Sequence, residues 1–147
     1  ERVWPSHLAR AGFGLAGDEA ARAIALRWVE GHPWLDLQGL NDNGRRAYHG
    51  ACALAANHLS VLLDASARAL VEQGHPDDAV HAALAVLLDS SLANLIALGI
   101  PSGITGPVAR GDTATVRQHV EALTEPARSL YEHLSARLEQ LVQGSTR

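Results

Sequence analysis

Two polar side chains within a stretch of apolar helix formers carry the first chemical signal of this sequence. His49 and Asn57 lie eight positions apart within residues 45–73, so a helix would place both on one stripe, with small residues such as Ala53 between them. A histidine beside an amide in such a gap can hold a carbonyl or carboxylate group and pass it a proton. The alternative is that His49 is a core histidine, satisfied by hydrogen bonds to its neighbours.

The second signal is a stretch rich in glycine and proline, GIPSGITGPVARGD at residues 99–112. Such stretches follow fixed backbone paths, and this one ends with Arg110 and Asp112 just before an expected helix. The planar guanidinium of Arg110 could bind an anionic substrate, assisted by the free amides at the start of that helix. The alternative is an ordinary connector in which Asp112 caps the helix and pairs with Arg110.

Composition narrows the classes of partner. The net charge of −4 argues against nucleic acid, and no uninterrupted apolar run reaches the roughly 18 residues that span a bilayer, so no membrane association is expected. The eight histidines lack zinc-site spacing, so no metal site is predicted. The single cysteine, Cys52, allows no disulfide within the chain and fits a reducing cytoplasm, which is the expected location.

Helices are expected to position both groups of candidate residues. The pattern predicts one long helix over 45–73 that ends at Gly74 and is buried because it is apolar on most sides. A second helix should run from Pro76 to Leu98 with Gly99 as its C-cap. A third is expected from Asp112 or Thr113 to about Leu123, and a fourth, capped by Thr124, to Val142.

The first 40 residues show a different pattern of predicted secondary structure. Short strands are expected at 13–17 and 34–37, on either side of a helix from Glu19 to about Glu30 that Asp18 caps. The predicted fold is therefore mainly α, a helical bundle preceded by a short β-α-β piece, with domains at 1–40 and 41–147. Because the long helix has more apolar surface than its short neighbours could cover, we expect a homodimer.

Three motifs together resemble a known family. They are the YHGACALAANHL segment that contains His49 and Asn57, the segment from Asn94-Leu95 to Gly99, and the TGPVARGD segment from Thr105 to Asp112. In this order and spacing, over nearly all of residues 12–142, they resemble the C-terminal domain of Rossmann-like oxidoreductases that is catalogued as domain-of-unknown-function family 2520. Ketopantoate reductase and 6-phosphogluconate dehydrogenase have similar domains.

The resemblance implies a helical domain of the 6-phosphogluconate dehydrogenase C-terminal type, which supplies substrate contacts and the dimer interface. In ketopantoate reductases the corresponding helix carries a Lys-x-x-x-Asn-x-x-x-Asn pattern. His49 would take the place of the lysine, Ala53 that of the first asparagine and Asn57 that of the second. By this resemblance, His49 and Asn57 are the predicted catalytic residues. Asn94, Thr105, Arg110 and Asp112 are the predicted substrate-binding residues, with Arg110 as a carboxylate clamp.

The resemblance also implies a cofactor, NADP or NAD, held mainly by an N-terminal nucleotide-binding domain. No Gly-x-Gly-x-x-Gly follows a strand in this sequence, so the chain alone is expected to bind no cofactor and to be inactive. The sequence begins with Glu1 rather than methionine, from which we expect a part of a larger enzyme. The expected partners are a small carboxylate substrate and a second copy of the chain.

Two other functions are compatible with the sequence. One is a standalone helical module that binds a ligand or forms oligomers without redox activity. The other is a self-contained lyase or isomerase that uses His49 and Asp112, for which the sequence offers suitable residue types and no further pattern.

Overall fold

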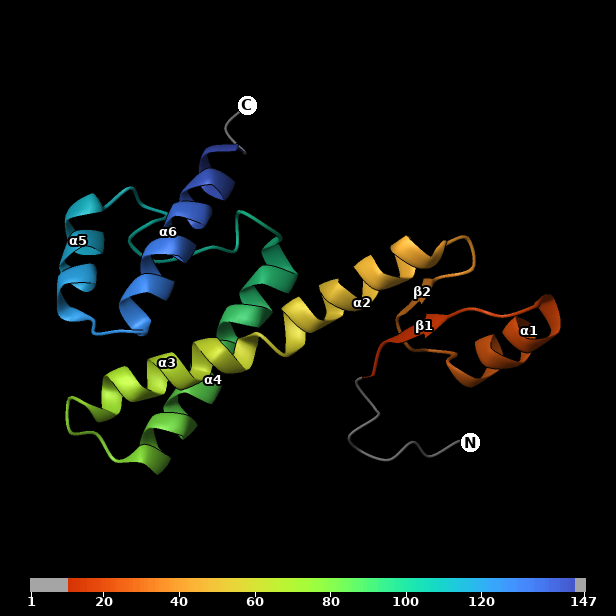
Figure 1. Ribbon diagram of the computed structural model, residues 1–147, viewed down its shortest axis with the longest axis horizontal. Helices are drawn as coiled ribbons and strands as arrows, with labels where there is room; N and C mark the ends of the chain where they lie inside the picture. The colour runs from red at the N-terminus through yellow and green to blue at the C-terminus, as the bar shows by residue number, and fades with distance from the viewer. Residues whose placement is uncertain (1–10, 145–147) are drawn as a thin grey trace. The chain divides into compact units, whose positions relative to one another are not determined.

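The computed structural model describes residues 11–144 and is mainly helical, with a short parallel β piece at its start, which confirms the predicted fold class (Figure 1). The elements follow one another as β1 Phe13–Leu15, α1 Glu19–Trp28, β2 Trp34–Asp36, α2 Asp42–Ala56, α3 Leu59–Val71, α4 Asp77–Leu98, α5 Thr113–Ala122 and α6 Ala127–Gly144. The chain divides into two compact units, Glu1–Leu54 and Ala55–Arg147, which are described in turn.

In the first unit, α1 connects two parallel strands, as the sequence predicts. Phe13 pairs with Trp34 and Leu15 with Asp36. Asp18 caps α1, since its Oδ1 accepts a hydrogen bond of 2.8 Å from the amide of Ala21. These local signals place both strands and the helix within a few residues of their predicted limits.

An ion pair then fastens α1 to β2. The Arg22 guanidinium donates two hydrogen bonds to the Asp36 carboxylate, one of them 2.9 Å from Nη2 to Oδ2. The backbone amide of Gln38 donates a further bond of 2.9 Å to Oδ1. Together these donors lower the pKa of Asp36 to about 2, with the Arg22 hydrogen bond as the largest cause.

The predicted long helix over 45–73 is wrong in one respect, because the structure has two helices that are separated at Asn57 and His58. Bonds of the i to i+3 type replace the α-helical ones here: the amide of Ser60 donates to the Asn57 carbonyl (3.2 Å) and that of Val61 to the His58 carbonyl (3.1 Å). The Ser60 hydroxyl donates to the same Asn57 carbonyl at 2.6 Å. A side-chain hydroxyl that competes for a backbone carbonyl in this way disturbs a helix, and asparagine adds low helix propensity.

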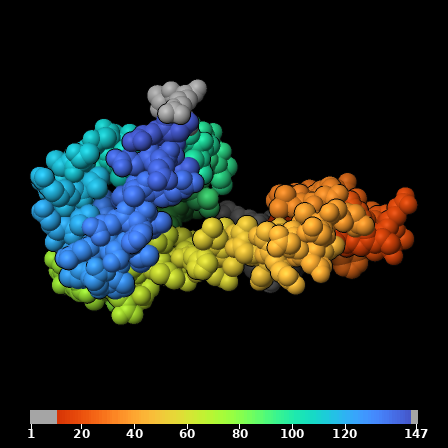
Figure 2. All heavy atoms as spheres, turned by 45° about the horizontal axis from the view of Figure 1, so that its top comes forward, coloured from red at the N-terminus to blue at the C-terminus, as the bar shows by residue number. Residues whose placement is uncertain are grey.

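The second unit is a bundle in which α3 and α4 lie side by side, and in which α6 packs on α3 and α5 (Figure 1). Its buried side chains are few: Ala65, Ala67 and Val80 are the buried apolar residues and Ser135 is the buried polar one. In Figure 2, α5 in cyan and α6 in blue form much of the visible surface of this unit. The helices α4 and α5 begin and end close to the predicted limits.

The expectation that the apolar helices are buried is wrong for this chain by itself. No residue of α2 is buried, and on α4 Val86 is 72% and Ile96 76% exposed. Of the described helices, α4 alone has the length and composition of a membrane-crossing segment, and most of its apolar length is exposed in this chain. The sequence prediction considered only uninterrupted apolar runs, and α4 does not contain one of this length because Asp89 interrupts it.

The start of the last helix also differs from its prediction. The Thr124 hydroxyl donates to Oε2 of Glu72 on the segment after α3, at 2.7 Å, rather than accepting from an amide of α6. Glu125 takes the capping role instead: its Oε2 accepts from the amide (3.3 Å) and hydroxyl (2.7 Å) of Ser129. A hydrogen bond to a carboxylate is charge-assisted and strong, so it fixes the Thr124 side chain towards the end of α3.

Candidate functional site

The loop that carries three predicted site residues is fixed on α4 by Gly103. A Cβ atom at this position would lie 2.8 Å from the Asn94 carbonyl oxygen and 2.9 Å from the Leu95 Cα. Gly103 is buried, and its amide donates to the Gly99 carbonyl at 2.8 Å. Only a residue without a side chain permits this approach, so glycine sets where the loop leaves the end of α4.

The second half of the loop closes into a compact turn just before α5. The amides of Arg110 and Asp112 both donate to the Pro107 carbonyl, at 3.2 and 2.9 Å, and the Gly111 amide donates to Val108 at 3.1 Å. Gly111 has a φ of +68°, which glycine adopts at little cost. The turn therefore fixes the backbone of Arg110 and Asp112 relative to the first turn of α5.

Asp112 is the N-cap of α5. Its Oδ1 accepts from the Thr115 amide at 3.0 Å and its Oδ2 from the Thr115 hydroxyl at 2.7 Å. These bonds, that of the hydroxyl first, lower the pKa of Asp112, and the charges of Arg110 and His119 act in the same direction. Each carboxylate oxygen thus already has a partner within the protein, so Asp112 holds the loop against α5.

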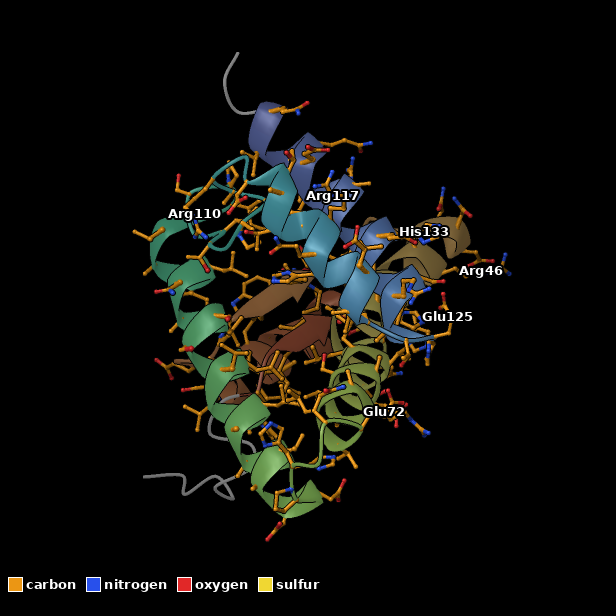
Figure 3. All side chains as sticks on the ribbon, turned by 90° about the vertical axis from the view of Figure 1, so that its left-hand side faces the viewer. Arg46, Glu72, Arg110, Arg117, Glu125 and His133 are labelled. Atoms are coloured by element: carbon orange, nitrogen blue, oxygen red, sulfur yellow. The ribbon has the colours of Figure 1, made fainter. Side chains whose placement is uncertain are left out.

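Arg110 differs from Asp112 because its side chain is exposed and uncommitted. Among residues 11–144, no hydrogen bond or ion pair engages its guanidinium. Figure 3 labels it on the loop between α4 and α5. A guanidinium on a rigid turn, with its five donors available, is suited to bind a carboxylate by two parallel hydrogen bonds. Thr105, earlier in the same loop, is exposed as well.

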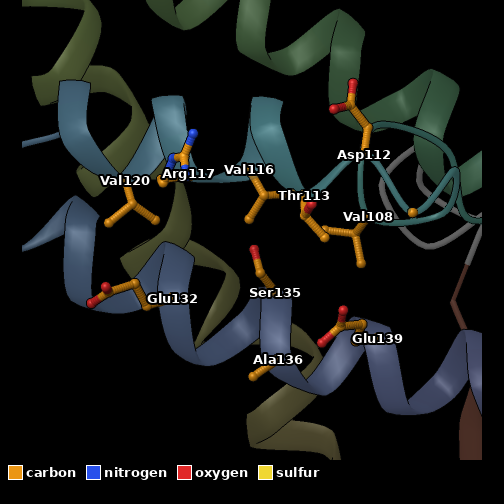
Figure 4. A pocket seen from close by; sticks show the side chains of 11 residues that line it. Val108, Asp112, Thr113, Val116, Arg117, Val120, Glu132, Ser135, Ala136 and Glu139 are labelled. Atoms are coloured by element: carbon orange, nitrogen blue, oxygen red, sulfur yellow. The ribbon is translucent and has the colours of Figure 1, made fainter.

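A pocket of about 270 Å³ lies between this loop, α5 and α6 (Figure 4). Val116 and Val120 of α5 point towards α6, and Ser135 of α6 points back at them, with Glu132 and Glu139 on either side. Ala136 also lines the pocket. Its further lining residues are Val108, Gly111, Asp112, Thr113 and Arg117. With three carboxylates and one arginine at its wall, the pocket favours a cationic or hydrogen-donating group over a carboxylate.

The other predicted site residues fall on different elements. Asn94 is exposed on the last turns of α4, where its backbone carbonyl contacts Gly103. Asn57 is exposed at the break between α2 and α3, and its carbonyl receives the bonds from Ser60. His49 is exposed on α2 in the first unit, whereas the other five predicted residues belong to the second unit.

The first unit does not fit the phosphates of a dinucleotide at its β1–α1 junction. A pyrophosphate site needs free amides and glycines at the start of the helix that follows the strand. Here the Asp18 carboxylate occupies an amide of that turn and Glu19 adds a second negative charge. The next helix, α2, also begins with an acid, Asp42. These carboxylates would repel a phosphate. Gly12, Gly14 and Gly17 have the spacing of the glycine motif, but Gly12 precedes β1 and Gly14 lies within it, so they do not form the turn after the strand that holds a pyrophosphate.

Several residues of this region were not predicted. Thr115 could have been found, since an Asp followed three residues later by a residue with a free amide and hydroxyl is a capping signal. Glu132 and Glu139 are seven positions apart and therefore share a helix face, but nothing in the sequence indicates that this face meets α5. The close contact of Gly103 depends on how the loop packs on α4, which no local pattern encodes.

Comparison with known proteins places the chain in a family and a fold. The family model of a domain of unknown function (DUF2520) matches residues 11–138, and no curated protein matches the chain. Protein TM1727 from Thermotoga maritima, known from a crystal structure, has a similar fold with a TM-score of 0.72 and 23% sequence identity. The similarity covers 91% of this chain and 54% of that protein, so this chain spans about half of its length. Because the family model matches most of the sequence, the chain belongs to the DUF2520 family.

Proposed function

We propose that this chain is the substrate-binding and dimerisation part of an NAD(P)-dependent oxidoreductase that acts on a small oxo or imino acid. The observation that carries the proposal is the uncommitted Arg110 guanidinium on a rigid turn, beside a pocket of contrasting charge. Arg110 would clamp the substrate carboxylate, and its neighbour Gly111 lines that pocket. The similarity to about half of a longer protein supports only the coarser part of the proposal, that a chain of this fold occurs within a larger protein.

The remaining predicted residues have defined roles in this proposal. His49 would donate a proton to the carbonyl or imine that accepts hydride, because histidine is the side chain that most often serves as a general acid in such a step. Asn57 and Asn94 would donate hydrogen bonds to the substrate, and Thr105 and Asp112 would keep the loop in shape. The cofactor would supply the hydride and would be held by a separate nucleotide-binding domain, since the β1–α1 junction does not fit its phosphates.

The acidic pocket favours an imino or amino acid over an oxo acid. Glu132 and Glu139 attract an iminium or ammonium group, while Arg110 outside the pocket attracts the carboxylate. An oxo acid offers only acceptors to these two glutamates and gains nothing from them. A calorimetric titration with alanine and with pyruvate separates these ligands, and Glu139→Gln should weaken alanine binding more than pyruvate binding.

The exposed apolar residues of α4 support a homodimer as the partner. A bilayer is the less suitable cover, because Asp89 lies near the middle of α4 and a charged residue at the centre of a membrane helix costs about 2.5–3.5 kcal/mol. Sedimentation should give a dimer, and Ile96→Glu should shift it towards monomer. A wild-type monomer at micromolar concentration would refute this part of the proposal.

The carboxylate clamp is tested by a pair of arginine substitutions. Arg110→Gln should weaken the binding of alanine and pyruvate about tenfold or more, since it removes a charge-assisted, bidentate hydrogen bond. Arg137→Gln is the matched control, because Arg137 is exposed on α6 and bonds to Gln140. Equal effects of the two substitutions would refute the clamp.

The redox assignment needs a different experiment, which also tests the alternative of a standalone helical module. The reading frame upstream of Glu1 should encode a strand followed by Gly-x-Gly-x-x-Gly, and that longer protein should oxidise NADPH or NADH with a 2-oxo or 2-imino acid. His49→Gln should lower its kcat about 100-fold or more, the usual contribution of a general acid. A native start codon near Glu1 would favour the standalone module.

A further inference from the structure

A groove in the second unit is separate from the proposed substrate site. Its volume is about 620 Å³, and α3, α4, α5 and α6 all contribute to its walls. Six of the residues that line it are Leu62, Ala65, Ala69, Ala122, Leu130 and Tyr131. None of the six predicted catalytic or substrate-binding residues lines this groove, so it is independent of the proposed substrate site, and it shares Leu87 with the apolar face of α4 that we propose for the dimer.

Small side chains create the hollow. Ala65 and Ala69 are one helical turn apart on α3, and Ala122 ends α5 on the opposite wall. Protein interiors are normally packed to a density of about 0.74, with few voids larger than a water molecule. A hollow of this size therefore leaves apolar side chains without the contacts that an occupant of the right shape would supply.

The mouth of the groove opens to solvent. Leu87 of α4 and Leu134 of α6 line it and are 59% and 43% exposed. A molecule can therefore enter without unfolding of the bundle. The volume lies within the range of about 300–1,000 Å³ that is typical of small-molecule sites, which are mostly apolar with a few convergent polar groups.

One polar pair stands at the otherwise apolar wall. His119 Nδ1 and the Tyr131 hydroxyl are 2.8 Å apart, and the two rings meet edge to face with centroids 5.5 Å apart. When Nδ1 is the acceptor, the Tyr131 hydroxyl donates to it and the ring proton resides on Nε2, which is then a donor. When the imidazole is protonated, Nδ1 donates to the tyrosine oxygen, whose own proton is released for a second acceptor. In both states the pair offers a donor to a ligand.

We propose that this groove binds an apolar molecule with a single carboxylate at one end. The alkyl part would fill the space along Ala65, Ala69 and Leu130, and the carboxylate would accept a hydrogen bond from the His119–Tyr131 pair. A ten-carbon carboxylate has about a dozen heavy atoms, and at roughly 30 Å³ each it fills somewhat more than half of the hollow. The occupant is thus defined by an apolar body and one acceptor group.

The probe for the test is decanoate, titrated calorimetrically into the full chain below its micellar concentration. Decanol and decylamine share its alkyl chain and differ in the end group. We expect decanoate to bind at least fivefold more tightly than decanol, and decylamine to bind more weakly than either. Equal affinity for all three would show that the His119–Tyr131 pair does not distinguish their end groups, and it would overturn the proposal.

Three substitutions locate the binding. Ala69→Phe fills the hollow and should weaken decanoate binding at least tenfold, while Tyr131→Phe removes one donor and should weaken it about fivefold to tenfold. Ile24→Ser is the control, because Ile24 is exposed on α1 of the first unit, does not line the groove, and its loss should change the affinity less than twofold. Circular dichroism of each variant establishes that the bundle is folded.

Two results would overturn the proposal. One is decanoate binding that Ile24→Ser weakens as much as Ala69→Phe does, which would mean general adhesion to apolar surface. The other is a chain that binds no decanoate and whose self-association, followed by sedimentation, is lost in Ala69→Phe. In that case the groove would be covered by a second copy of the chain.

Discussion

The contact of Gly103 with α4 leads to a prediction whose sign can be tested against a control in the same chain. A Cβ at Gly103 would lie 2.8 Å from the Asn94 carbonyl oxygen, about 0.6 Å closer than the 3.4 Å of ordinary contacts. The nearest atoms are all backbone atoms of a helix, so no side-chain rotation can relieve the clash. Gly103→Ala should therefore force the loop away from α4, at the upper end of the roughly 1–3 kcal/mol that overpacking costs.

Gly50→Ala makes the same chemical change with the opposite expected sign. Gly50 lies inside α2, and a Cβ there would meet no atom within 4 Å. An alanine would lower the conformational entropy of the unfolded chain and should stabilise the helix by about 0.5–1 kcal/mol. Because the two substitutions add the same methyl group, a difference in sign can come only from their surroundings.

The assay is unfolding in urea, followed by two probes. All three tryptophans precede residue 55, so their fluorescence reports on the first unit, whereas circular dichroism at 222 nm reports on the helices of both. Gly103→Ala should lower the midpoint of the circular dichroism transition and leave the tryptophan transition unchanged. A loss below about 0.5 kcal/mol, or a change seen mainly by tryptophan, would refute the reasoning from contact distances.

Further predictions concern charges and caps. The Arg22 bonds place the folded pKa of Asp36 at about 2, below its ordinary value of 3.8, so this stabilisation is complete above pH 4 and is lost as the pH falls towards 2. In an acid titration followed by tryptophan fluorescence, Asp36→Asn should flatten that part of the curve; an unchanged curve would assign the acid response to other groups. Asp112→Ala should remove the cap of α5 and speed amide hydrogen exchange at Thr115, while Asp112→Asn should keep most of the protection. Thr124→Val should lower the melting temperature more than Thr124→Ser, since only valine loses the hydroxyl that bonds to the end of α3.

How far the sequence predicted the fold depended on how local each interaction is. Asp18 caps α1 through a residue three positions away and Gly99 ends α4 through Leu95, so both boundaries could be read from short patterns. The break after α2 was not predicted. It arises because the Ser60 hydroxyl competes for the Asn57 carbonyl, an effect that spans only three residues inside an otherwise strong helix pattern.

Contacts between segments that are far apart in the chain could not be predicted from the sequence. The bond from Thr124 to Glu72 joins residues 52 positions apart, and it redirects a hydroxyl that local reasoning assigns to a helix cap. The pair of His119 and Tyr131 depends on how α5 turns into α6. Residue types indicated that Arg110 and its loop were chemically interesting, but only packing shows that its guanidinium is uncommitted while the neighbouring carboxylate is not.

The interruption at Asn57 and His58 also determines where the chain is most open to attack. The last carbonyls of α2 and the first amides of α3 lack helical partners, and the residues around the break are exposed. Local opening therefore costs less here than inside a helix, and a protease of broad specificity should cut here before it cuts within a helix. One cut would leave β1 to α2 on one fragment and α3 to α6 on the other. The break thus marks the natural point at which to separate the two halves for study.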